Sequence, residues 1–201
     1  MRKIIVGAFV SLDGVMQAPG DSQEDMEGGF SQGGWQMPYF DADAGKIMDE
    51  YIAATEALLL GRKTYQIFAA YWPTAPTDDT IAKKFNSVPK YVVSTTLDNA
   101  EWNNSTLIKR NVAEEVAKLK QQPGSGILSV TGSGKLAQTL MKHNLVDEYE
   151  LWIHPLVLGS GKRLFEDGVV PSNLKLVNTR KTGSGVSILT YQPDNNNLGP
   201  H

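Results

Sequence analysis

The chain has 201 residues, of which 41% are hydrophobic and 20% are charged, and this composition is typical of an ordinary globular protein. The net charge of -3 excludes general electrostatic attraction to nucleic acid or to an anionic membrane, so any anion site has to be local. The lack of cysteine excludes disulfides and thiolate nucleophiles, and we expect a cytoplasmic protein with no segment that spans a bilayer. The length suits one domain, which we place at residues 1–193, followed by a disordered tail at 194–201.

The first part of the chain alternates predicted strands and helices. Residues 3–12 are apolar and β-branched, as in a strand buried on both faces. Residues 13–39 are rich in Gly, Pro, Ser and acidic residues without a period, which predicts a long loop. A helix over 41–55, a strand over 57–60 and a helix over 63–71 follow.

The second part ends in consecutive strands. The predicted elements are helix 80–85, strand 90–95, helix 112–121, strand 127–131, helix 134–143, strand 148–158, and strands 174–181 and 186–192 around a Thr-Gly-Ser-Gly hairpin turn. Strands alternate with helices first and then follow one another. This order predicts an α/β fold with a mostly parallel sheet and antiparallel strands at the C-terminus.

The stretch ALLLGRKTYQIF places two cations at the predicted start of a helix. A buried strand ends at Gly61, and Arg62, Lys63 and Thr64 occupy the first helical turn. Cations at a helix N-terminus oppose the helix dipole, and a bound phosphate would reverse that cost. The alternative is a solvated first turn without a ligand.

The sequence Gly-Ser-Gly-Lys occurs twice, at Gly132–Lys135 and at Gly159–Lys162. Neither copy is an ATP-binding P-loop, because both lack the earlier glycine and the Ser or Thr that must follow the lysine. The first copy links a predicted strand to a predicted helix, where free backbone N–H groups bind phosphate. The alternative is that its glycines only shape a tight turn.

Three hydroxyl residues, Ser94, Thr95 and Thr96, end another predicted strand and form a third candidate for anion binding. Such residues also serve ordinary turns. Ligands bind outside the carboxyl ends of parallel strands in α/β sheets, so one dinucleotide would reach several of these candidates.

The segments IIVGAFVSLDG, LLLGRKTY, YVVSTTL, ILSVTGSGKL and HPLVLGSGKRLF resemble, in this order, the dihydrofolate reductase superfamily. The resemblance covers nearly the whole chain. It is greatest to the bacterial branch related to the reductase domain of the bifunctional riboflavin-biosynthesis deaminase/reductase. It implies a dihydrofolate-reductase-like three-layer α/β/α fold, a bound NADPH and a homodimer.

The resemblance also implies roles for individual cofactor-binding residues. In the segment of Gly61, Arg62, Lys63 and Thr64, Thr64 would lie near the pyrophosphate and the two cations near the adenosine 2′-phosphate. Ser94, Thr95 and Thr96 would form the second wall of that subsite. Thr95 stands where many relatives have arginine, which leaves the preference for NADPH over NADH open.

The resemblance also assigns residues of this chain to the pyrophosphate and to the nicotinamide of the cofactor. The residues Gly132, Ser133, Gly134 and Lys135 resemble a second pyrophosphate turn. The backbone of Ala8 resembles the position that meets the nicotinamide carboxamide.

The segment WQMPYFD indicates the residues that would bind the substrate. It resembles a segment of folate enzymes that precedes an acidic residue. Trp35 and Phe40 are the predicted substrate-binding residues, and Asp41 is the predicted catalytic acid, with Asp43 in reserve. The alternative for Asp41 is an ordinary helix N-cap, for which aspartate is favoured.

Together these features predict a reductase that transfers hydride from NADPH to a C=N or C=O of a small pteridine- or pyrimidine-like substrate. Asp41 would orient the substrate or relay a proton, and the loop at 13–39 would close as a lid. Two alternatives stay open: an NADPH-binding protein without turnover, and a true dihydrofolate reductase. We expect no metal site, because no second ligand stands at a suitable spacing beside His143 or His154.

Overall fold

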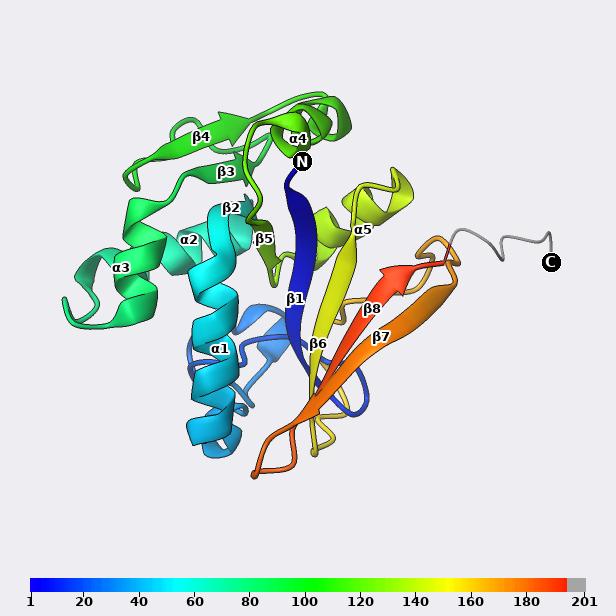
Figure 1. The fold of residues 1–201 in the computed structure, drawn as a ribbon. Helices are drawn as coiled ribbons and strands as arrows, with labels where there is room; N and C mark the ends of the chain where they lie inside the picture. The colour runs from blue at the N-terminus through cyan, green and yellow to red at the C-terminus, as the bar shows by residue number, and fades with distance from the viewer. Residues whose placement is uncertain (195–201) are drawn as a thin grey trace.

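The apolar segments of the chain form an eight-stranded sheet in the computed structural model, which describes residues 1–194 (Figure 1). The strands are β1 (Lys3–Ser11), β2 (Thr55–Gly61), β3 (Lys90–Val93), β4 (Ser105–Ile108), β5 (Ile127–Thr131), β6 (Glu148–His154), β7 (Leu174–Lys181) and β8 (Ser187–Pro193). The helices are α1 (Ala42–Ala54), α2 (Arg62–Tyr71), α3 (Thr80–Ser87), α4 (Val112–Gln121) and α5 (Gly134–Lys142), with single 3-10 turns η1 (Glu27–Gly29), η2 (Met37–Tyr39) and η3 (Trp72–Thr74).

The strand order is β4-β3-β2-β5-β1-β6-β8-β7. The first six strands in this order pair in parallel, whereas β8 is antiparallel to both β6 and β7. The predicted α/β class, with antiparallel strands at the C-terminus, is confirmed. Because parallel strands need crossover connections, the helices lie on both faces of the sheet and produce three layers.

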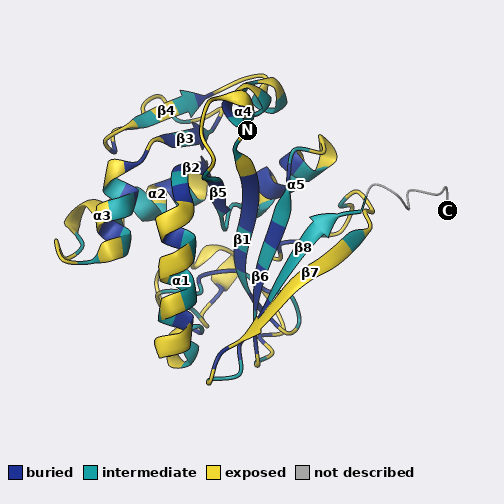
Figure 2. Cartoon of the chain, in the orientation of Figure 1, coloured by how far each residue is buried: buried dark blue, intermediate teal, exposed yellow. Residues whose placement is uncertain are grey.

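The core is split by the sheet. Alternate residues of β1, such as Ile4 and Val6, pack with Leu140 against α4 and α5, whereas Leu58 and Leu60 of β2 face α1, α2 and α3. The central strands are largely buried, but β7 is exposed along almost its whole length (Figure 2).

Most predicted elements agree with the structure to within a few residues. The exception is β4, which the sequence pattern did not predict because it is short and follows the polar residues Asn103 and Asn104. The predicted strand over 148–158 ends earlier, at His154. In the predicted tail, the amide of Asp194 still donates to the Asn173 carbonyl, and residues 195–201 lie outside the described part.

The described helices are short, and the longest of them, α1, has 13 residues. Over residues 1–194, none of them has both the length and the apolar character needed to traverse a bilayer.

Lys90 is a charged residue at the start of β3 with a fully buried side chain. Its ammonium donates to the carbonyls of Asn86 (3.1 Å) and Asn103 (2.9 Å) and lies 4.3 Å from the centre of the Trp102 ring. Among the described residues no carboxylate pairs with it. Burial lowers the pKa of Lys90 to about 8.

This buried lysine should make stability depend on pH. The unfolded chain binds a proton at Lys90 up to pH 10.5 and the folded chain only up to about pH 8, so its contribution to stability rises with pH between these values. In chemical denaturation, the free energy of unfolding of the wild type should rise relative to Lys90→Met, by at most about 1.4 kcal/mol per pH unit. Parallel curves for the two proteins over this range would contradict the expectation.

Candidate active site

The starts of two helices face each other at the carboxyl ends of β2 and β5. These strands are neighbours in the sheet, and α2 and α5 begin directly after the turns that follow them. The amide of Gly61 donates to Ser133 Oγ (3.0 Å), and Ser133 Oγ donates to Thr64 Oγ1 (3.0 Å). The structure therefore brings together the two glycine motifs that the sequence placed far apart.

Both helix starts lack any negative group of their own. Neither has a side-chain cap or an acid in its first turn, and Arg62, Lys63 and Lys135 are the charged residues there. By contrast, Asp41 and Asp79 cap α1 and α3, and two glutamates occupy the first turn of α4. Two positive helix ends thus converge without an acidic residue of their own, an arrangement that suits a bound anion.

One edge of β1 has no neighbouring strand beyond Gly7, close to the turn that starts α5. Pairing of β1 with β5 ends at Gly7, whose carbonyl accepts from the Gly132 amide (3.1 Å), whereas pairing with β6 continues to Ser11. From Ala8 onward, the edge of β1 that faced β5 has no paired strand. Its backbone is therefore placed next to the turn that starts α5.

The third predicted group lies at the end of β3, the neighbour of β2 on the side away from β5. Ser94 is buried, and its Oγ accepts from the amides of Thr96 (3.2 Å) and Leu97 (3.0 Å). Thr95 and Thr96 are exposed. The Ser94 hydroxyl thus shapes the turn, and the two threonines are the groups free to meet a ligand.

Lys63 is paired with an acidic residue of the long loop. Its ammonium lies 3.5 Å from Asp25, whose carboxylate also binds Lys162 (2.7 Å). Burial raises the pKa of Asp25, but the hydrogen bond from Lys162 and its neighbours outweigh this effect and lower the pKa overall. Arg62 bonds only to the neutral Gln66 (3.4 Å) and, over residues 1–194, has no carboxylate partner.

The second Gly-Ser-Gly-Lys copy anchors the long loop. Gln17 donates from Nε2 to the carbonyls of Asp25 and Glu27, and its Oε1 accepts from the Lys162 amide. Gly161 has φ +134°, and a Cβ there would come within 2.6 Å of Val15 Cγ1, so glycine is required. Sequence patterns did not predict this role of Gln17, Asp25 and Lys162, although the second copy of the motif was a signal.

Asp41 is bonded as a structural residue. One carboxylate oxygen accepts from the Ala44 amide (2.9 Å) at the start of α1, and the other accepts from the Ser184 amide (2.7 Å) in the β7–β8 turn. The bond from Ala44 is the main cause that lowers the pKa of Asp41. Asp43 accepts from the Gly183 amide of the same turn. This geometry favours the N-cap interpretation, and the catalytic role of Asp41 stays a prediction.

The two predicted substrate residues lie apart in different surroundings. Trp35 is buried inside the loop, donates to the Gln17 carbonyl (2.7 Å) and packs edge-on against His154. Phe40 is 40% exposed beside Gly45. Their role in substrate binding stays a prediction.

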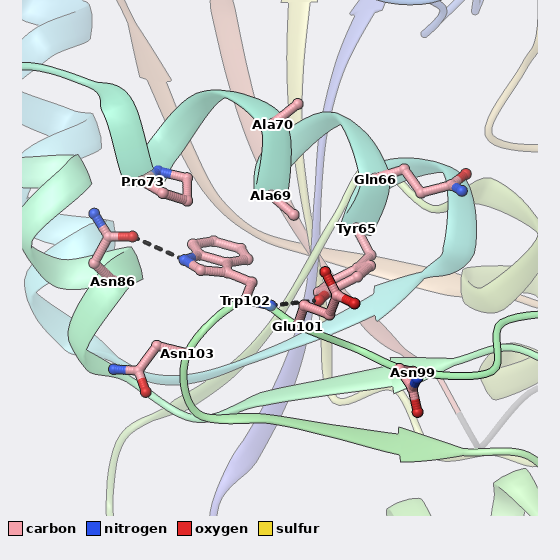
Figure 3. A pocket seen from close by; sticks show the side chains of 10 residues that line it. All are labelled: Tyr65, Gln66, Ala69, Ala70, Pro73, Asn86, Asn99, Glu101, Trp102 and Asn103. Carbon is pink, nitrogen blue, oxygen red and sulfur yellow. Dashed lines mark hydrogen bonds between the residues drawn. The ribbon is translucent and has the colours of Figure 1, made fainter.

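A hollow of about 680 Å³ lies between α2, α3 and the β3–β4 connection (Figure 3). Two of its polar side chains are engaged by Trp102, which donates from its indole to Asn86 and from its backbone to the Tyr65 hydroxyl. None of the residues predicted to bind cofactor or substrate lines it. The hollow is therefore separate from the convergent helix starts.

Within residues 1–194, no cluster of three or more His, Asp or Glu side chains has the arrangement to hold a metal ion. His154 lies among the rings of Phe9, Trp35 and Tyr39, and burial lowers its pKa.

Comparison with known proteins identifies the family. The model of the RibD C-terminal domain matches residues 2–188. The chain belongs to this family. It is 36% identical over 193 residues to the uncharacterized protein YyaP of Bacillus subtilis (strain 168), covering 94% of each chain. It is 27% identical over 187 residues to the uncharacterized protein YwjB of the same organism, covering 93% of this chain and 96% of YwjB.

Solved structures share the fold at low identity. A riboflavin biosynthesis protein assigned in Shewanella sp. PV-4 matches with a TM-score of 0.70 at 20% identity, over 96% of this chain and 99% of the other. Dihydrofolate reductase from Enterococcus faecalis, solved with NADP(H), matches with 0.58 at 15%, over 96% and 97%. A pyrimidine reductase-like protein from Corynebacterium diphtheriae matches with 0.60 at 12%, over 97% and 93%. The fold is dihydrofolate-reductase-like, as predicted, and of the reductase type.

Removing the Asp25 carboxylate should loosen the long loop. We expect Asp25→Ala to lower the free energy of unfolding by about 1–3 kcal/mol, because its bonds to two lysines and to the Glu27 amide are lost. Glu27→Ala is the matched control, since Glu27 is exposed and pairs only with Lys162. Equal losses for the two variants in urea denaturation would contradict this role of Asp25.

The two aspartates at the start of α1 should differ in their contribution to stability. Asp41→Ala should lower the Tm more than Asp43→Ala, because Asp41 caps the helix and also binds Ser184, whereas Asp43 accepts a single bond from the turn. Calorimetry on both variants measures the difference. An Asp41→Ala protein as stable as the wild type would contradict the role of Asp41 as the N-cap of α1.

Proposed function

We propose that this protein is an NADPH-dependent reductase that acts on a small heterocyclic or carbonyl substrate. The observation that carries the proposal is the pair of uncapped, cation-bearing helix starts joined through Ser133. A dinucleotide has a pyrophosphate that fits two such ends at once. The family match and the NADP(H) bound to the enterococcal neighbour support the same conclusion.

The donors present fit NADPH. The free amides at the start of α2, with Thr64, and those at the start of α5 would hold the pyrophosphate. Arg62 would bind the 2′-phosphate, with Thr95 and Thr96 as the opposite wall. The backbone from Ala8 would orient the nicotinamide carboxamide. When bound, NADPH supplies the hydride.

The substrate class rests on the neighbours and on the site. The names of two structural neighbours refer to riboflavin biosynthesis and to pyrimidine reduction. A flat amino-heterocycle with a C=N, or an open-chain carbonyl attached to one, is the substrate that we propose. The ordered loop over 13–40 would exclude water from the reacting atoms.

A second candidate function is cofactor binding without turnover, and the engagement of Asp41 favours it. Both oxygens of the predicted acid already bind backbone amides. Absorbance at 340 nm separates the two functions, with 7,8-dihydropterin, dihydrofolate, aminopyrimidines and simple aldehydes as substrates. Oxidation of bound NADPH by one of these compounds supports the reductase, and tight binding with no oxidation by any supports the second candidate.

Arg62→Ala tests the cofactor assignment. The affinity for NADPH should fall by about 10- to 100-fold, because a charge-assisted bond to the 2′-phosphate is lost, whereas the affinity for NADH should change little. The neighbouring variant Lys63→Ala is the control and should have a smaller effect, since Asp25 already pairs with Lys63. Titration calorimetry with both cofactors gives the ratios, and equal losses for NADPH and NADH in Arg62→Ala would exclude Arg62 from the 2′-phosphate site.

A further inference from the structure

A line of hydroxyl groups runs beneath α1 toward the end of β5. The hydroxyl of Tyr51 on α1 lies 2.8 Å from Ser129 Oγ, which lies 3.1 Å from Thr131 Oγ1. In both contacts either oxygen can donate, so the line can be polarised in either direction. Thr131 directly precedes Gly132, so the line ends at the proposed cofactor turn.

The register of the sheet places a carboxylate in the same row as Thr131, on the far side of Gly7. Gly7 of β1 is paired with Thr131 on one side and with Glu150 of β6 on the other. Paired residues of neighbouring strands point to the same face, so these three form a row under α1. A Cβ on Gly7 would lie 3.3 Å from the Tyr51 hydroxyl, and glycine therefore leaves the room that the phenol occupies.

The row is buried only in part. Thr131, Gly7 and Glu150 each keep some exposure although they lie in the middle of an eight-stranded sheet, whereas Ser129 is completely buried. The opposite face of β5 holds Leu128 and Val130, which are fully buried. The hydroxyls of Ser129 and Thr131 thus occupy the α1 side of β5, whose other face is apolar. Thr131 and Glu150, at the two ends of the row, are both partly exposed to solvent.

Glu150 has the surroundings of a proton donor. It accepts from the Trp152 indole (3.0 Å), and burial is the main cause that raises its pKa. The charge of Glu150 in turn raises the pKa of the Tyr51 phenol, after the larger effect of burial.

Three further charged groups face Glu150. Glu148 on the same strand and Glu50 on α1 raise its pKa, and Arg180 on β7 lowers it. Arg180 and Glu50 form an ion pair with both side chains largely exposed. Glu150 therefore lies at the solvent side of α1, where it can be reprotonated by water.

We propose that Glu150, Tyr51, Ser129 and Thr131 form a proton path that crosses beneath α1 and protonates the substrate beside Gly132. This inference rests on the proposed function. As the substrate carbon of the C=N or C=O accepts hydride, its nitrogen or oxygen takes a proton from Thr131 Oγ1. Ser129 returns a proton to Thr131 and Tyr51 to Ser129. Within residues 1–194 no direct hydrogen bond joins Glu150 to Tyr51, so in the proposal a water carries the proton from Glu150 to Tyr51, and solvent restores Glu150. The net consumption is one hydride and one solvent proton per substrate.

The path would protonate the substrate without Asp41, whose two carboxylate oxygens already accept hydrogen bonds from α1 and from the β7–β8 turn. If Tyr51 and Ser129 had only a structural role, their hydroxyls would form the same hydrogen bond, but neither the carboxyl band nor the reaction rate would depend on Glu150. The two roles are therefore separated by variants of the first two members of the path, Glu150→Gln and Tyr51→Phe. Glu148→Gln is the matched control, because Glu148 lies on the same strand and its carboxylate pairs with Lys3.

The first readout is infrared titration of the carboxyl C=O band without substrate, over about pH 4 to 9. The path predicts a protonated band above the usual range that is absent in Glu150→Gln and is shifted in Tyr51→Phe. In Glu148→Gln the path predicts that the band stays present and that its titration midpoint falls, because the charge of Glu148 raises the pKa of Glu150. A band that Tyr51→Phe leaves unchanged would overturn the path, even if the protein binds no NADPH.

The second readout is NADPH oxidation with 7,8-dihydropterin, and with the other compounds of the panel above, against pH. The wild-type rate should fall as pH rises through the pKa of Glu150, because the protonated acid is needed. Tyr51→Phe and Glu150→Gln should be about 100-fold slower, with NADPH affinity within about twofold of the wild type, and Glu150→Gln should lose the pH dependence. Rates within about twofold of Glu148→Gln would overturn the path.

Failure of the proposed function is distinguishable from failure of the path. A wild-type protein that does not bind NADPH rejects the function, and the infrared result still decides whether Tyr51 is coupled to Glu150. A wild type that binds NADPH but reduces no compound of the panel overturns the path as a catalytic device.

Discussion

The contact on which the site depends is the hydroxyl of Ser133, which accepts from the Gly61 amide and donates to Thr64. It fixes the start of α5 against the start of α2. Ser133 has φ 52° and follows Gly132 at φ 58°, so the chain adopts two consecutive left-handed residues to place this hydroxyl. Two positive helix ends side by side repel each other, and an anion between them would convert this repulsion into attraction.

The rest of the site follows from the parallel arrangement of β3, β2, β5 and β1. Their carboxyl ends lie along one side of the sheet, so the turns after them are placed where a single ligand could contact several of them. The long loop adds a local charge balance, since Asp25 and Glu27 face Lys63 and Lys162. Arg62 is therefore the cation in the first turn of α2 that has no carboxylate partner within residues 1–194.

Local patterns were sufficient to predict most of the fold and the two glycine motifs, because hydrophobic periodicity and turn residues act over short distances. The strand β4 has too few residues for such a pattern. The pairing of Lys63 with Asp25 and the second bond of Asp41 join residues far apart in the chain, so no spacing indicates them. The hydroxyl path depends on strand register, which a single sequence does not specify.

A crystal structure with NADP(H) bound tests the central claim most directly, because it locates the pyrophosphate. The account predicts that the pyrophosphate lies between the amides of residues 62–64 and those of residues 133–135, with Arg62 on the 2′-phosphate. A cofactor seated elsewhere, such as in the hollow beside Trp102, would contradict it, and so would a cofactor that leaves both helix starts without contact.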